Sequence, residues 1–484
     1  MRLKVLGYLL GTLLFYLGLV MLLPLAWSIT DRGTVFLSFL IPAVLSITGG
    51  LMLRHGSGPP EDLSIKESFT FVVLAWSFAA LLGTLPYLLS GSLNSFVNAF
   101  FESMSGFTTT GATVLVDIEV LPRSILLWRS LTQWLGGMGI IALFIALLPR
   151  LGVRSFYLLK AEIPGPEPDR VVPRIAETAK MLWLIYLVIS AAEFILLLFC
   201  GLSIFDALNH TFTTMPTGGF STYNDSIAAF GSARVEIIII FFMLLAGGNF
   251  TLYYGIWRHR WRQLFRDMEF RFYLLVICVA AIAMVIIIYP LYEGSPGEAT
   301  RKAIFQVIAI VTTTGYATAD FDSWPALGKM ILFFLMFLGG SGGSTGGGMK
   351  QIRILILLKY GLREIKKTLH PSAVISLRLG GRVIPENLVH NIVGFSLLYF
   401  LIFIIVSLSL GAMGYDIVTS FSVAASCLGN VGPALGALGP SLTYEPLPGA
   451  AKYLLSATML LGRLEIFTIL VLLLPEVRST RFKL

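Results

Sequence analysis

The chain has 484 residues, of which 56% are hydrophobic and only 13% are charged. Because a soluble surface needs about a quarter of its residues charged, this composition excludes an ordinary soluble protein. Uncharged apolar stretches at 237–245, 274–288 and 395–410 lie in segments near the roughly 20 residues that cross a bilayer. The sequence therefore predicts a polytopic, all-α membrane protein.

Ten apolar segments, each bounded by charges, glycine or proline, are expected to cross the membrane. They lie near 5–29, 34–53, 69–90, 124–149, 179–200, 237–256, 271–291, 329–359, 389–411 and 452–474. The first follows Arg2 and Lys4 as a signal peptide would, but its length and the lack of a clear cleavage site predict a retained span. Three widely spaced cysteines, Cys200, Cys278 and Cys427, form no CxxC pair and predict neither a disulfide framework nor a zinc site.

The formal net charge is +8, so the distribution of the basic residues along the chain must show what they do. If the N-terminus is cytoplasmic, 26 of the 35 basic residues fall on the cytoplasmic side and eight on the outer side, with Arg463 left inside a span. This asymmetry follows the positive-inside rule and predicts that both termini are cytoplasmic. Since topology accounts for the basic surplus, no nucleic-acid partner is expected.

Four segments between paired spans are too apolar for loops and too short to cross, and they resemble one another. Their equivalent glycines, separated by 108, 96 and 117 residues, are Gly111, Gly219, Gly315 and Gly432. Twelve residues before these glycines the chain has Ala99, Ala207, Ala303 and Ser420. The second span of each unit also carries a pair of residues that we call its small-residue mark: Gly136-Gly137, Gly247-Gly248, Gly339-Gly340 and Gly462-Arg463. Helix packing alone would explain the presence of glycines, but it would not explain why the flanking residues keep the same spacing from them in each segment. The spacing indicates an internal repeat of about a hundred residues.

Each repeat is interpreted as a span, a short descending helix, an extended glycine-containing segment and a second span. All four repeats begin on the cytoplasmic side, so they are parallel and should surround one axis along the membrane normal. The predicted organisation is two N-terminal transmembrane helices in 1–66, then pore repeats in 67–160, 161–262, 263–370 and 371–484.

The four extended segments are suited to coordinate a cation. Non-helical backbone at membrane depth is tolerated only where it is buried or lines water, so four such segments around an axis would line a pore. Extended backbone can turn carbonyl oxygens inward, glycine permits dihedrals closed to other residues, and rings of such dipoles replace the hydration shell of a monovalent cation. The C-terminal ends of the short helices add partial negative charge. The predicted ligands are Thr109, Thr110, Gly111, Thr217, Gly218, Gly219, Thr313, Thr314, Gly315, Asn430, Val431 and Gly432.

Acidic residues gather near the outer ends of these segments. They are Asp117, Glu119, Asp225, Asp320 and Asp322, with Glu102 and Asp206 in the short helices. They could concentrate cations at the mouth of a pore, or they could be ordinary solvated loop charges and helix caps. The sequence leaves both interpretations open.

The repeat motifs together resemble a known family. Thr110-Gly111, Gly218-Gly219-Phe220-Ser221-Thr222, Thr313-Thr314-Gly315-Tyr316 and Asn430-Val431-Gly432-Pro433 are similar to the pore signatures of the TrkH/TrkG bacterial potassium-uptake subunits, in the larger group with KtrB and the plant HKT transporters. The resemblance covers essentially the whole chain, including the two extra N-terminal spans. It implies a homodimer in the bacterial inner membrane with one potassium pathway per subunit, gated by a cytosolic nucleotide-binding ring protein of the TrkA type. Potassium would be the bound substrate, with no organic cofactor. Pro216 departs from the repeat, because units one and three have threonine there.

A glycine-rich run interrupts the eighth span, and so many glycines should break a helix at about 1 kcal/mol each. In relatives of this family a similar intramembrane loop acts as a gate below the filter. The gate residues implied here are Gly339, Gly340, Gly342, Gly343, Gly346, Gly347 and Gly348, together with Arg463. A Walker loop is excluded because Gln351, rather than Ser or Thr, follows Lys350. Arg463 near the middle of a span is a functional candidate, and its alternative is a structural pair with Glu465 or with carbonyls of the glycine run.

Two other functions remain to be weighed. A secondary transporter coupled to Na⁺ or H⁺ would carry the same filter residues. An intramembrane serine protease would use Ser341, which lies in a GxSxG pattern, but His390 is the only histidine in a predicted span and lies near its edge. The sequence predicts a transport protein and not an enzyme.

Overall fold

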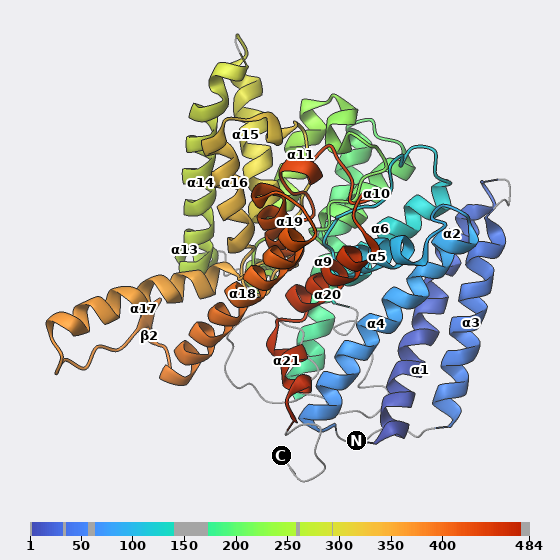
Figure 1. Cartoon of the computed structure of the whole chain (residues 1–484), viewed down its shortest axis with the longest axis horizontal. Coiled ribbons are helices and arrows are strands. Elements are labelled where there is room, and N and C mark those ends of the chain that lie inside the picture. Colours follow the sequence, from blue (N-terminus) through green and yellow to red (C-terminus); the bar gives the residue numbers. More distant parts are fainter. Residues whose placement is uncertain are drawn as a thin grey trace.

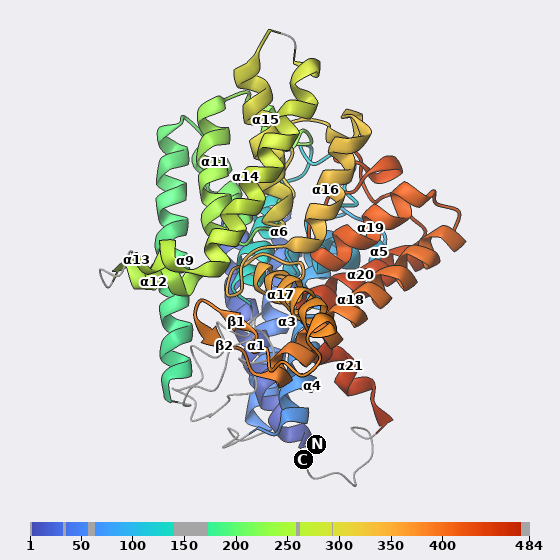
Figure 2. The same cartoon turned by 90° about the vertical axis from the view of Figure 1, so that its left-hand side faces the viewer.

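The structure is a computed structural model that describes residues 2–31, 35–56, 63–139, 173–257, 262–292 and 294–475. Within these ranges the protein is almost entirely helical (Figure 1). Its only β structure in these ranges is an antiparallel hairpin of β1 (Arg378–Leu379) and β2 (Arg382–Val383), with Arg378 opposite Val383. The start of α1 and the end of α21 lie at the same end of the molecule in both views (Figure 1; Figure 2).

Four consecutive units share one order of elements: a long helix, a short helix, an extended segment and a second long helix. Unit one has α4 (Ile65–Leu89), α5 (Phe96–Phe107) and α6 (Arg123–Gly137). Unit two has α9 (Pro173–Phe199), α10 (Ile204–Thr214), α11 (Ala233–Ala246), α12 (Phe250–Trp257) and α13 (Arg262–Arg266). Unit three has α14 (Met268–Ile288), α15 (Pro296–Val311), α16 (Ala326–Leu338) and α17 (Gln351–Leu369). Unit four has α18 (Glu386–Ala412), α19 (Ile417–Gly429), α20 (Gly449–Arg463) and α21 (Phe467–Leu473). This order confirms the predicted fold class.

The remaining elements precede or connect the units. Three helices come first: α1 (Leu3–Val20), α2 (Leu22–Ser28) and α3 (Phe36–His55). Short 3₁₀ turns are η2 (Ser226–Phe230), η3 (Tyr289–Leu291), η4 (Phe321–Ser323) and η5 (Gly436–Leu438). Figure 1 shows α1 and α3 side by side at one edge of the molecule. They approach closely because a Cβ added at Gly11 would clash with the Gly50 carbonyl, and one added at Gly50 would clash with the Gly11 carbonyl.

Six helices in the described part of the chain are long and apolar enough to cross a membrane. They are Leu3–Ser28, Phe36–His55, Lys66–Leu89, Ala179–Phe199, Met268–Leu291 and Glu386–Ala412, and they match six of the ten predicted spans. The other four predictions are the second spans of the units. Residues 140–149 of the first of these, and the predicted unit boundary at 160/161, lie outside the described residues.

The second spans are interrupted at their small-residue marks. Helix α11 ends at Ala246 before Gly247, and α16 ends at Leu338 before Gly339. Helices α20 and α21 meet at an angle of 114° just after Arg463. The predicted spans at 237–256 and 452–474 are therefore each divided between two helices, and the predicted break in 329–359 is confirmed.

The short helices are largely buried, and several of the first long helices expose apolar side chains. Every residue of α19 from Ser422 to Gly429 is buried. By contrast, α14 and α18 leave large apolar side chains exposed, among them Leu275, Ile282, Ile286, Leu397 and Leu408. A protein that is apolar on its surface and lined by short polar-ended helices within is organised for a lipid surround.

Candidate ion-conducting site

Each short helix ends in the same backbone motif. The residues after the four helix ends, Thr109, Thr217, Thr313 and Asn430, adopt left-handed conformations with φ of 56°, 56°, 60° and 53°. The next N–H then donates to the carbonyl five residues back, at 2.8–2.9 Å: Thr110 to Ser105, Gly218 to Thr213, Thr314 to Ala309 and Val431 to Ser426. This is a Schellman closure, in which glycine is the usual left-handed residue. Threonine there costs about 1–2 kcal/mol, so three units hold a strained residue at the same place.

We call residues 109–111, 217–219, 313–315 and 430–432 the filter segments. Their N–H groups turn back to the helix ends, which leaves the carbonyl oxygens to point elsewhere. In the described part of the chain, hydrogen-bond donors reach only two of these twelve carbonyls: Gln133 Nε2 donates to Gly218 and Tyr444 Oη donates to Gly432, both at 2.8 Å. Since nearly all buried carbonyls have a partner, such a set of free oxygens needs a ligand or water.

The repeat glycines pack the filter segments into a closed ring. A Cβ added at Gly111 would clash with the Gly218 carbonyl oxygen of the next unit. The same holds from Gly219 to Thr314, from Gly315 to Val431 and from Gly432 back to Thr110. Each segment therefore touches the next in chain order, and the fourth touches the first. All four glycines also have positive φ, between 75° and 103°, so a side chain would be strained as well as crowded.

The ring is only approximately fourfold in its hydroxyl groups. Thr108 and Thr110 share a hydroxyl–hydroxyl hydrogen bond of 2.8 Å, and Thr312 and Thr314 repeat it. Unit two has Pro216 and Gly218 at these positions and cannot form the pair. In unit four the amide of Asn430 instead donates to Thr110 Oγ1 at 2.9 Å.

The outer acidic residues are held by local hydrogen bonds. Glu102 is fully buried and ion-paired to Arg129 at 2.8 Å, so the idea that it attracts cations at the mouth is wrong. Asp206 accepts from Ser203 and Thr222, while Asp320 accepts from the Asp322 N–H. Asn224 binds both Asp117 and Glu119. Most of these carboxylates therefore have a structural role in turns and helix starts.

Residues 339–350, which we call the glycine loop, lie directly beneath the filter segments. The Thr345 hydroxyl donates to the Met215 carbonyl at 3.0 Å, and the Gly347 N–H donates to Thr313 Oγ1 at 2.6 Å. A Cβ at Gly347 would clash with the Gly429 carbonyl. The predicted gate glycines are thus brought together, and the loop touches the filter ends of units two, three and four.

Arg463 connects this loop to unit one. Its guanidinium donates to the Thr345 carbonyl at 2.9 Å and to the Gly136 and Gly137 carbonyls at 2.6 and 2.7 Å. Of the two structural pairs considered from the sequence, the loop carbonyls are found. The carboxylate of Glu465 instead binds Arg353 at 2.5 Å.

Three polar residues of this region were not predicted from the sequence. Lys350 is buried with φ of 71°, and its ammonium group donates to the Gly346 carbonyl. Glu269 accepts from the N–H groups of Gly342 and Ile352, at 2.5 and 3.2 Å, and so fixes both ends of the loop. Gln133 accepts from the Phe220 N–H at 3.1 Å besides donating to Gly218. A charged or amide side chain inside a predicted apolar span was the available signal for Lys350 and Gln133, whereas Glu269 precedes the predicted span at 271–291 and carried no such signal.

Comparison with known proteins gives one consistent result. A family model described as "TrkH: Cation transport protein" matches residues 34–482. The Trk system potassium uptake protein TrkH of Halomonas elongata is 40% identical, over 98% of this chain and 99% of that protein. That of Escherichia coli (strain K12) is 43% identical over 86% of each chain, and TrkG of the same strain is 34% identical over 97% of each. The crystal structure of the potassium transporter TrkH from Vibrio parahaemolyticus superimposes with a TM-score of 0.89 at 36% identity, covering 99% of this chain and 100% of that one. With a model matched over most of its length and full-length relatives above 30% identity, the chain belongs to the TrkH family of cation transport proteins.

Proposed function

We propose that this protein takes up potassium across the bacterial cytoplasmic membrane through the ring of four filter segments. The observation that carries the proposal is the closed ring of segments, in which most carbonyl oxygens receive no donor from the described residues. Rings of backbone carbonyls replace the hydration shell of K⁺. The relatives named as potassium uptake proteins support the choice of K⁺ as substrate.

The glycine loop and Arg463 form the gate in this proposal. The loop obstructs the path because it is anchored on three units, and the guanidinium adds a positive charge against a passing cation. A cytosolic TrkA-type ring would open the gate by pulling the loop or the helix that follows it. Helix α17, which follows the loop directly, projects at one side of the molecule beside the start of α18 and offers a lever for this movement (Figure 1). A homodimer with one pathway per subunit is part of the same proposal.

Membership of a transport family confirms that the chain is not an enzyme. Coupling to Na⁺ or H⁺ is the remaining alternative, because a coupled carrier would use the same ring.

Reversal potentials of the purified protein in planar bilayers test the proposal. With unequal K⁺ concentrations on the two sides, the potential should follow the K⁺ gradient and should not move when a proton gradient or a small Na⁺ gradient is added. Replacing K⁺ by Na⁺ on one side then gives the K⁺-to-Na⁺ permeability ratio. A potential that shifts with the proton or Na⁺ gradient would establish the coupled alternative. No preference for K⁺ over Na⁺ would refute the potassium assignment.

A further inference from the structure

A side chain from each short helix braces the outer end of its own filter segment. Nine residues before the repeat glycines stand Glu102, His210, Gln306 and Val423. Glu102 accepts from the Val114 N–H at 2.9 Å, and Gln306 accepts in the same way from Thr318 at 3.1 Å. The ring of His210 contacts the Ser221 hydroxyl at 3.1 Å, and in unit four the neighbouring Ser422 accepts from the Leu435 N–H at 3.0 Å. The brace is a repeated feature, although its chemistry differs in every unit.

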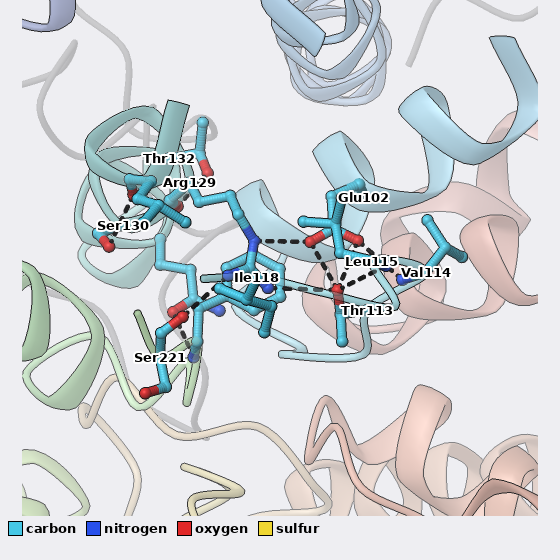
Figure 3. A network of polar contacts seen from close by, with 12 residues as sticks. Glu102, Thr113, Val114, Leu115, Ile118, Arg129, Ser130, Thr132 and Ser221 are labelled. Atoms are coloured by element: carbon cyan, nitrogen blue, oxygen red, sulfur yellow. Dashed lines mark hydrogen bonds and ion pairs between the residues drawn. The ribbon is translucent and has the colours of Figure 1, made fainter. Parts of the chain in front are cut away.

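Unit one alone makes this brace with an ion pair. Arg129 on α6 donates through Nε to Glu102 Oε1 at 2.8 Å, and both side chains are almost completely inaccessible (Figure 3). The residue seven places before each small-residue mark is Arg129 in unit one and Ile240, Leu332 and Leu455 in the others. A buried ion pair is weak evidence for stability, because apolar residues of similar volume often stabilise as well or better. The pair therefore calls for another explanation.

Arg129 reaches across to the second filter segment. Its Nη1 donates to the Ser221 carbonyl at 3.0 Å, and its guanidinium carbon lies 3.9 Å from the centre of the Phe220 ring. Its Nη2 donates to Thr113 Oγ1 at 3.2 Å, and Thr113 in turn donates to Glu102 (Figure 3). One guanidinium thus holds the chain just beyond the filter glycines of two adjoining units.

The second segment has a specific need for this support. It lacks the paired hydroxyls of units one and three because Pro216 and Gly218 replace threonines. Gln133, one turn along α6 from Arg129, binds Gly218 and Phe220 from the same side. Two side chains of α6 therefore supply from unit one the contacts that the second segment does not make for itself.

We propose that Arg129, oriented by Glu102, is a positioning residue that sets ion selectivity by fixing the outer ends of the first and second filter segments relative to each other. This inference rests on the proposed potassium pathway. Arginine is required because its planar fork reaches three acceptors at once, which the single ammonium of lysine cannot do. The carbonyls of these segments would otherwise relax to fit a smaller ion.

Two variants of the full-length protein in bilayers test the idea. Arg129→Lys keeps the charge opposite Glu102 but cannot also hold Ser221 and Thr113. The double variant Glu102→Gln/Arg129→Leu copies Gln306 and Leu332 of unit three, so it removes both charges and keeps an acceptor for Val114. In each, the K⁺-to-Na⁺ permeability ratio should fall about tenfold, the factor expected for one lost charge-assisted hydrogen bond. Arg301→Lys is the matched control, since Arg301 forms an outer ion pair with Glu236 and has no place in the filter braces; its ratio should equal that of the wild type.

The outcomes separate this inference from the proposed function. If the wild type selects K⁺ and both Arg129 variants, correctly folded, keep its ratio, the inference is overturned and the potassium pathway stands. If the double variant does not fold, Arg129→Lys decides alone: a folded Arg129→Lys with the wild-type ratio overturns the inference, and a lower ratio supports it. A wild type that does not prefer K⁺ overturns both.

Discussion

Arg463 combines a structural and an electrostatic role at a single position. Its guanidinium satisfies carbonyls from unit one and from the glycine loop, which explains how a charge is tolerated at this depth. The charge itself remains beneath the filter segments. If it lies about 6 Å from a passing K⁺ at an effective dielectric near 20, the repulsion is roughly 3 kcal/mol.

Replacing Arg463 should therefore change the rate of transport. Arg463→Ala is expected to raise K⁺ flux into liposomes by up to about a hundredfold, because that barrier is removed and the loop loses a donor. Arg463→Lys should stay closer to the wild type, since it keeps the charge. A well-folded alanine variant, checked by its melting temperature, with unchanged or lower flux would show that the residue is only structural.

The strained left-handed residues show what the sequence could not predict at this scale. The glycines at 111, 219, 315 and 432 were identified because they recur at equivalent positions of the repeat, and glycine permits dihedrals closed to other residues. Thr109, Thr217 and Thr313 were predicted as ligands, but nothing marked them as left-handed, because threonine is disfavoured there. The surrounding helix ends and neighbouring segments impose that conformation, and a single sequence does not contain those contacts in readable form.

At the scale of elements, the glycine loop is held by its backbone rather than by an apolar core. Its N–H groups bind Gly247, Glu269 and Thr313, and its glycines at 339, 343 and 348 have positive φ. Such a segment has few apolar contacts to lose when it moves. It can therefore change conformation at a lower cost than a helix.

Shortening this loop should open the pathway. Deleting Gly346, Gly347 and Gly348 removes the contacts with Thr313 and Gly429, so K⁺ flux without a cytosolic partner should rise. Flux assays with and without added partner protein, on material of equal melting temperature, provide the check. If a folded deletion variant still depends fully on the partner, the loop is not the gate.

The packing of α1 on α3 offers a test within one helix. A Cβ at Gly50 would collide with the backbone of Gly11 and Phe15, whereas one at Gly49 would meet nothing within 4 Å. Gly50→Ala should destabilise the protein by about 1–3 kcal/mol. Gly49→Ala, its matched control, should be neutral or stabilise by up to about 1 kcal/mol through helix propensity. Thermal unfolding in detergent would measure both, and equal melting temperatures would contradict the close helix contact.

Helix breaks were the least predictable elements. The break at 339–350 was predicted because ten residues there are almost all small. The 114° bend after Arg463 was not, because Glu465 and Ile466, which adopt φ of 53° and 27°, carry no glycine or proline signal. At the bend, Glu465 forms an ion pair with Arg353 of unit three, a contact that the sequence does not reveal.

For the whole molecule, the repeat made the architecture predictable. The spacing of the four glycines, together with the positive-inside asymmetry, predicted parallel units around one axis, and the ring closure from Gly432 to Thr110 agrees with it. Pro216 indicated from the sequence that the ring departs from fourfold symmetry, but the side-chain contacts from α6 of unit one and from Tyr444 of unit four were not predictable. Gln133 lies on α6, far in sequence from the second filter glycine. Tyr444 lies in an irregular segment of unit four.

The central claim is that the four segments act as one potassium filter. Its most direct test is the reversal potential under opposed K⁺ and Na⁺ for serine at each of Gly111, Gly219, Gly315 and Gly432. Gly201→Ser is the control, because Gly201 also has positive φ, 90°, but a Cβ there meets nothing within 4 Å. All four filter variants should show a lower K⁺-to-Na⁺ permeability ratio than both the wild type and Gly201→Ser. Folded variants that keep the wild-type ratio would contradict the account.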